Sequence, residues 1–131
     1  MLLRSELVSL AKARLRDAEI LLRARRSDCA VYLCGYAVEL AIKARICRTL
    51  AWPGFPETAR EFDKLHSFKS NDLDTLLHLS GREDKVRSML IREWTEVSQW
   101  TTETRYRPIG SATEAAARAM IDAARTLLPR L

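Results

Sequence analysis

The sequence predicts an all-α fold, a compact bundle of four to five helices that residues 1–131 form as a single domain. Apolar residues recur at steps of three and four over most of the chain, which is the spacing of one helical face. Only four glycines and four prolines are present, too few for a β-rich fold with its frequent turns. A chain of 131 residues that is 47% hydrophobic and 30% charged suits one globular core.

Two long helices are expected first, from about Ser5 to Arg26 and from about Asp28 to Leu50. The apolar face of the first consists of Leu7, Ala11, Leu15, Ala18 and Leu22. Ser27 and Asp28 break this pattern and are residue types that cap a following helix. The second segment is apolar nearly all round over most of its length, which is typical of a helix buried at the centre of a bundle. Trp52-Pro53-Gly54 ends it.

Shorter helices are expected in the rest of the chain. A helical turn near Thr58 to Leu65 precedes a third helix, from about Ser70 or Asn71 to Leu79. Ser80-Gly81-Arg82-Glu83 fits a capping box that opens a fourth helix. Its inner face is expected to hold Val86, Leu90, Trp94 and Val97. After a loop from Thr101 to Ile109, Ser111-Ala112-Thr113-Glu114 fits a second capping box. The inner positions of this last helix are expected to include Ala116, Met120, Ala123 and Leu127.

The cysteines point to a reducing compartment. Cys29, Cys34 and Cys47 are an odd number without a C-x-x-C pair, which is typical neither of a disulfide framework nor of a zinc site. The first residues contain no long apolar run, and the longest one, Cys29 to Val38, is too short to span a bilayer. We therefore expect a cytoplasmic protein that does not enter a membrane.

The charge is unevenly distributed along the chain. The net charge of +5 comes from 22 Lys and Arg against 17 Asp and Glu. Residues 1–52 carry ten basic and five acidic side chains, whereas residues 53–100 carry seven and nine. A surface with this excess would attract RNA or an acidic partner at low salt. The alternative for each basic stretch is an ordinary solvated helix face.

Two groups of residues are candidates for a binding site. Glu39 interrupts the most apolar helix, with Lys43 four residues later. Either the two form a solvated i,i+4 pair, or Glu39 is a partly buried acid that orients a basic group across the bundle. Arg105, Tyr106 and Arg107 lie in a predicted loop, where arginines bind phosphate and the ring offers a face for a base. The alternative is that Arg105 ties the loop to the bundle.

Metal and cofactor sites are not predicted. His66 and His78 lie twelve residues apart without the spacing of a metal-binding pair, and the isolated glycines form no phosphate-binding loop.

Three stretches, in this order, resemble the HEPN domains, small helical-bundle proteins. The first resembles the second helix of that family and is Asp28-x-Ala30-x-Tyr32-Leu33-x-Gly35-Tyr36-Ala37-x-Glu39-x-x-x-Lys43-Ala44, preceded by Ala18-Glu19-x-Leu21-Leu22. The second, Lys69-Ser70-Asn71-Asp72-Leu73, is similar to a Lys-Thr/Ser-His-Asp-Leu stretch, with Asn71 where His is usual. The third, Arg105-Tyr106-x-Pro108, resembles the loop before the last helix.

The resemblance implies a helical bundle, frequently a homodimer, that works on or with RNA or nucleotides. Many members are toxins or defence components, and many pair with a small nucleotidyltransferase. Active members are metal-independent endoribonucleases that use an Arg and a His separated by four to six residues. The His acts as acid or base at the ribose 2′-hydroxyl, and the Arg stabilises the charge of the phosphorane.

This sequence departs from that catalytic pattern. Arg105 and Arg107 have no His after them, and Arg60 and His66, which have the right separation, precede the Asn71 stretch rather than lying where the family's pair does. We therefore predict a toxin–antitoxin or defence module that binds RNA, a nucleotide or a partner, without ribonuclease activity. Its expected cleft is lined by Glu39, Lys43, Arg105, Tyr106 and Arg107. One alternative is an endoribonuclease toxin with Arg60 and His66 as catalytic residues, and another is a purely structural partner of a nucleotidyltransferase.

Overall fold

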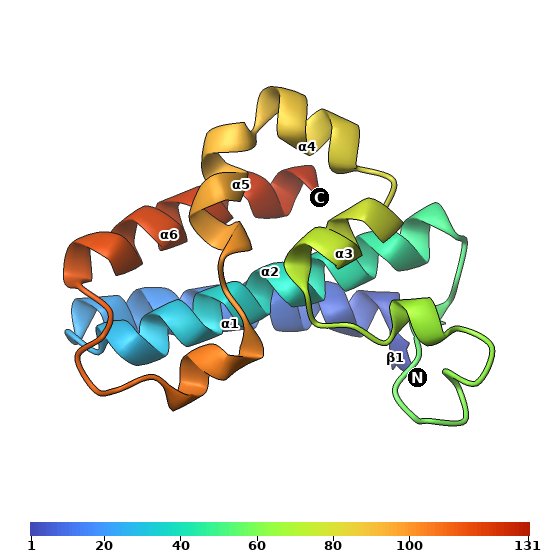
Figure 1. Cartoon of the computed structure of the whole chain (residues 1–131), viewed down its shortest axis with the longest axis horizontal. Helices are drawn as coiled ribbons and strands as arrows, with labels where there is room; N and C mark the ends of the chain where they lie inside the picture. The colour runs from blue at the N-terminus through green and yellow to red at the C-terminus, as the bar shows by residue number, and fades with distance from the viewer.

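The computed structural model describes residues 1–131, and its architecture is helical, which confirms the all-α prediction. The α-helices are α1 (Arg4–Arg23), α2 (Ser27–Thr49), α3 (Leu73–Leu79), α4 (Glu83–Met89), α5 (Ile91–Ser98) and α6 (Glu114–Leu127). The short 3₁₀ helices are η1 (His66–Phe68), η2 (Thr102–Tyr106) and η3 (Leu128–Arg130). Figure 1 shows α1 and α2 lying side by side as a long hairpin, with α6 packed against both and α3 against α2.

Helix α2 is the centre of the core. Twelve of its residues are buried, including the carboxylate-bearing Glu39. At Gly35 the indole of Trp100 packs directly on the helix backbone, and a Cβ at this position would overlap the ring. Trp100 also lies against Tyr32, with ring centroids 6.0 Å apart. The glycine therefore lets the chain after α5 close over the middle of α2.

The expected fourth helix is two helices, α4 and α5, which meet at Leu90. Leu90 has φ −132° and ψ 30°, outside the helical region. All four expected inner residues are nevertheless buried: Val86, Leu90, Trp94 and Val97. The bend directs α5 onto α6, and the Trp94 indole N–H donates to Asp74 Oδ1 at 3.0 Å. Side-chain periodicity reports which residues face the core, but not a change of axis between them.

The two expected capping boxes and one expected inner residue of the last helix, Ala116, were wrong. The N-cap position of α4 is Arg82, whose side chain makes no capping hydrogen bond. Ser80 Oγ accepts a hydrogen bond from the backbone N–H of Arg82 and closes no capping box. Helix α6 is capped by Thr113, whose hydroxyl accepts from the Ala116 N–H at 3.0 Å. Ala117, not Ala116, is buried, whereas Met120, Ala123 and Leu127 are buried as expected.

The segment after α2 differs from expectation only in part. The expected helical turn is present as hydrogen-bonded turns, in which the Phe62 N–H donates to the Thr58 carbonyl at 3.1 Å, and η1 follows. Two short strands, β1 (Leu2–Leu3) and β2 (Gly54–Phe55), pair antiparallel and tie the start of the chain to this segment. None of the helices has the length and the apolar character needed to cross a membrane.

Candidate functional site

Glu39 and Lys43 form an ion pair inside the bundle. The Lys43 Nζ lies 2.7 Å from Glu39 Oε1, and Glu39 is only 4% exposed. The same Nζ donates to Asn71 Oδ1 at 3.3 Å and lies 5.2 Å from the centroid of the Phe55 ring. The i,i+4 spacing thus produces the expected pair. The Glu39 carboxylate is buried, whereas the Lys43 side chain is 17% exposed and connects α2 to the segment before α3.

Arg105 and Tyr106 form an exposed pair at the end of η2. The Arg105 guanidinium carbon lies 4.9 Å from the centroid of the Tyr106 ring, which is cation–π distance. Tyr106 is 71% exposed, and no acidic side chain pairs with Arg105. The neighbouring Tyr32 and then Tyr106 raise the pKa of Arg105, so its guanidinium keeps its charge. Arg107, which follows, is also exposed.

The loop that carries this pair is fixed at both ends. Before it, Trp100 packs on Gly35 of α2. After it, the Asp28 carboxylate accepts from the backbone N–H of Gly110 at 2.7 Å and from that of Ala112 at 2.9 Å. These two hydrogen bonds lower the pKa of Asp28. A residue expected to cap α2 therefore holds the far end of the loop, and the N-cap position of α2 is Arg26.

The structure places the five predicted binding residues in two separate groups. Glu39 and Lys43 pair with each other, and no hydrogen bond or ion pair joins either to Arg105. Along α2, the Tyr32 beside Arg105 precedes Glu39 by two turns, about 10 Å at 1.5 Å per residue. A single cleft lined by all five residues stays a prediction.

Arg60 and His66, the alternative catalytic pair, are both exposed. Arg60 lies among the turns before η1, and His66 is the first residue of η1. No hydrogen bond joins their side chains, and none fixes the His66 ring. Elsewhere, no three His, Cys, Asp or Glu side chains gather as a metal ion requires.

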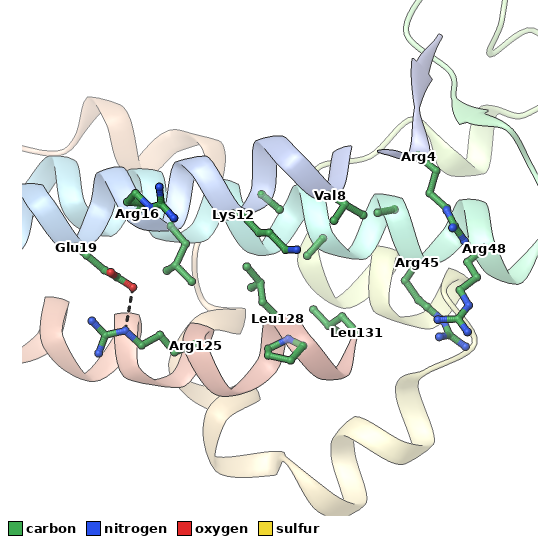
Figure 2. Close-up of a pocket in the computed structure, with 15 residues that line it drawn as sticks. Arg4, Val8, Lys12, Arg16, Glu19, Arg45, Arg48, Arg125, Leu128 and Leu131 are labelled. Atoms are coloured by element: carbon green, nitrogen blue, oxygen red, sulfur yellow. Dashed lines mark hydrogen bonds and ion pairs between the residues drawn. The ribbon is translucent and has the colours of Figure 1, made fainter. Parts of the chain in front are cut away.

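A groove that none of the predicted residues lines runs between α1, α2 and the end of α6 (Figure 2). Its volume is about 720 Å³. Its unpaired cations are Arg4, Lys12, Arg16, Arg45 and Arg48. The i,i+4 spacing of Lys12 and Arg16 and the i,i+3 spacing of Arg45 and Arg48 are visible in the sequence, as is the positive excess of residues 1–52. What the sequence does not show is that the two helices turn these residues toward one space.

Comparison with known protein families gives a match over nearly the whole chain. A family model described as the HEPN domain matches residues 5–130. Neither the curated proteins nor the solved structures gave a match.

Proposed function

The chain belongs to the HEPN family, and from that premise we propose that it is a non-catalytic module that binds single-stranded RNA through the η2 loop. The observation that carries the proposal is the exposed Arg105–Tyr106 pair, which no acidic side chain neutralises. Proteins that bind single strands combine cations for the phosphates with aromatic faces for the bases. Arg105 and Arg107 supply the first and Tyr106 the second.

The anchoring of the loop supports the same function. A binding loop loses affinity when it must be ordered on binding. Here Trp100 on one side and the Asp28 carboxylate on the other hold the loop before any RNA arrives. Stacking of a base on Tyr106 would therefore cost little conformational entropy.

Ribonuclease activity is not part of the proposal. General acid–base catalysis needs a histidine within reach of the ribose hydroxyl and a fixed ring orientation. The exposed His66 ring has no hydrogen-bond partner that orients it, and no hydrogen bond joins it to Arg60. We expect RNA to remain intact when it is incubated with the protein, and His66→Ala to change nothing in that assay.

The cellular setting follows from the family resemblance. We propose that the domain acts in a toxin–antitoxin or defence pair, with a nucleotidyltransferase as partner and a homodimer as its own state. Co-expression with the neighbouring gene product and measurement of the mass of the purified complex test this part separately. A complex that contains only this chain would contradict the pairing.

The test of RNA binding compares Tyr106→Ala with Tyr106→Phe. Fluorescence anisotropy with a labelled single-stranded RNA of about ten nucleotides reports the affinity. Because one base–aromatic stack contributes about 1 to 3 kcal/mol, Tyr106→Ala is expected to weaken binding at least fivefold, whereas Tyr106→Phe keeps the ring and the affinity. Equal affinities of the wild type and Tyr106→Ala for RNA would show that the η2 loop does not bind RNA through Tyr106.

A further inference from the structure

The groove beside α1 has the make-up of a docking site, with an apolar floor and a cationic rim. The floor consists of Val8, Ala11, Leu15, Ala41, Ala44 and Leu128. Figure 2 shows Arg4, Arg45 and Arg48 gathered at one end, and the Glu19–Arg125 ion pair at the other. That pair joins Glu19 to Arg125 at 2.9 Å, so the only acidic side chain in the groove is already neutralised.

Five of the six cations of the groove have no ion-pair partner within the chain. No ion pair or side-chain hydrogen bond involves Arg4, Lys12, Arg16, Arg45 or Arg48. The Nε of Arg45 is buried and has no acceptor. Partial burial and repulsion by Arg82 and Arg48 lower the pKa of Arg45. A charged arginine with a buried N–H that has no acceptor destabilises the fold, unless an anion from another molecule accepts its hydrogen bond and neutralises its charge.

The shape of the groove favours an extended ligand. Its residues on α1 recur at steps of three and four from Arg4 to Glu19, so they form one face of that helix. From Arg4 to Arg16 this face is about 18 Å long at 1.5 Å per residue. Arg4, Arg45 and Arg48 gather at one end of it, and Lys12 and Arg16 extend the positive charge along α1 beyond the reach of a single phosphate group. The three floor alanines lack bulk, so a helix backbone can approach closely.

We propose that this groove docks an acidic amphipathic helix of a partner protein. The apolar face of that helix would lie on the floor, and its carboxylates would face the cationic rim, which is the helix-in-groove mode of recognition. The negative end of a helix dipole is its C-terminus, so the bound helix would point its C-terminal end at Arg4, Arg45 and Arg48. This surface is separate from the η2 loop, and the proposal does not depend on RNA binding.

The probe for the test is a capped synthetic helix of about 16 residues, long enough to be partly helical in water. It carries leucines at i, i+3, i+4 and i+7 and glutamates at the flanking positions. A scrambled peptide of the same composition has the same charge without the apolar face. Binding of both to the full chain is measured by fluorescence anisotropy.

Two pairs of variants localise the binding. Val8 is 39% exposed in the groove and Ile20 is 51% exposed outside it, so Val8→Asp and Ile20→Asp add the same charge at two surface positions. Two positive charges are removed from the groove by Arg45→Gln/Arg48→Gln. Two are removed from the η2 loop by Arg105→Gln/Arg107→Gln. Circular dichroism and thermal melts show whether the variants keep the fold.

The proposal expects saturable binding of the amphipathic peptide that is at least tenfold weaker for Val8→Asp and for Arg45→Gln/Arg48→Gln. The Ile20→Asp and Arg105→Gln/Arg107→Gln variants should bind it like the wild type. Equal binding of the scrambled peptide, or no binding at millimolar concentration, would overturn the proposal. So would single-stranded RNA binding that Arg45→Gln/Arg48→Gln weakens and Val8→Asp does not, because the groove would then be a phosphate-backbone site.

Discussion

The Glu39 carboxylate and the Lys43 ammonium group meet at 2.7 Å within the bundle, where Glu39 is almost completely buried. Removing the cation that neutralises a buried carboxylate leaves an unpaired buried charge, which destabilises the fold. The pair is therefore a sensitive point of the fold as well as a predicted part of the binding site.

Replacing Lys43 by Met is expected to lower the free energy of unfolding by about 3 kcal/mol, because Glu39 is left without its cation. The double variant Glu39→Leu/Lys43→Met removes both charges and is expected to recover most of that loss. Urea unfolding of the three proteins measures the coupling. If the double variant were no more stable than Lys43→Met, the two side chains would not be coupled. If Lys43→Met weakened RNA binding without changing the free energy of unfolding, Lys43 would contact the RNA rather than stabilise Glu39.

The two hydrogen bonds of Asp28 predict a pH dependence of stability. Because they lower its pKa in the folded state, the unfolded chain binds the proton more tightly. The stabilisation by Asp28 is thus complete above the unfolded pKa of about 3.9 and is lost as the pH falls through the lower folded value.

Asp28→Asn, which can accept only one of the two hydrogen bonds through its amide oxygen, is the matched variant. Its melting temperature is expected to lie below that of the wild type at neutral pH, and the difference should shrink below about pH 4. Thermal melts between neutral pH and about pH 3 provide the measurement. A difference that stays constant over this range would mean that the carboxylate charge of Asp28 does not hold the loop.

The cysteines are expected to react at very different rates. Burial raises the pKa of Cys34 to about 12, and its thiol donates to the Met120 carbonyl at 3.6 Å between α2 and α6. Burial also raises the pKa of Cys47, whereas Cys29 is exposed. Because the thiolate is the reactive form, a disulfide reagent near pH 8 should modify Cys29 alone in the native protein.

Counting the modified thiols before and after denaturation tests this, with Cys29→Ser as the control. Rapid modification of Cys34 in native Cys29→Ser would show that α6 separates from α2 on the time scale of the reaction.

Local signals explain how much of the fold the sequence predicts. Helices α1 and α6 follow from apolar periodicity and α2 from its long apolar run, and both ends of α1 and α2 were predicted to within about three residues. The break at Leu90 was missed because the expected inner residues stay buried on both sides of it, and the change of direction shows only in the non-helical φ and ψ of Leu90. The pairing of β1 with β2 was missed because it joins segments far apart in the chain.

In the candidate site, too, local spacing was predicted from the sequence, whereas contacts between distant segments were not. The spacing of Glu39 and Lys43 predicts their ion pair, since four residues make one helical turn. The contacts of Lys43 with Phe55 and Asn71, which lie in the segment after α2, could not be predicted from this spacing. Likewise, the basic stretches of α1 and α2 are visible in the sequence, but the groove exists only because η3 lies beside both helices.

The most direct test of RNA binding at the η2 loop is its salt dependence. For single strands, each cation that contacts a phosphate contributes about 0.7 to the slope of log K against log salt concentration. Removing two such contacts in Arg105→Gln/Arg107→Gln should therefore reduce the slope by about 1.4. The Arg23→Gln/Arg26→Gln variant, with the same loss of charge outside the loop and the groove, should keep the wild-type slope. A wild-type slope in Arg105→Gln/Arg107→Gln, or no RNA binding at low salt, would contradict the account.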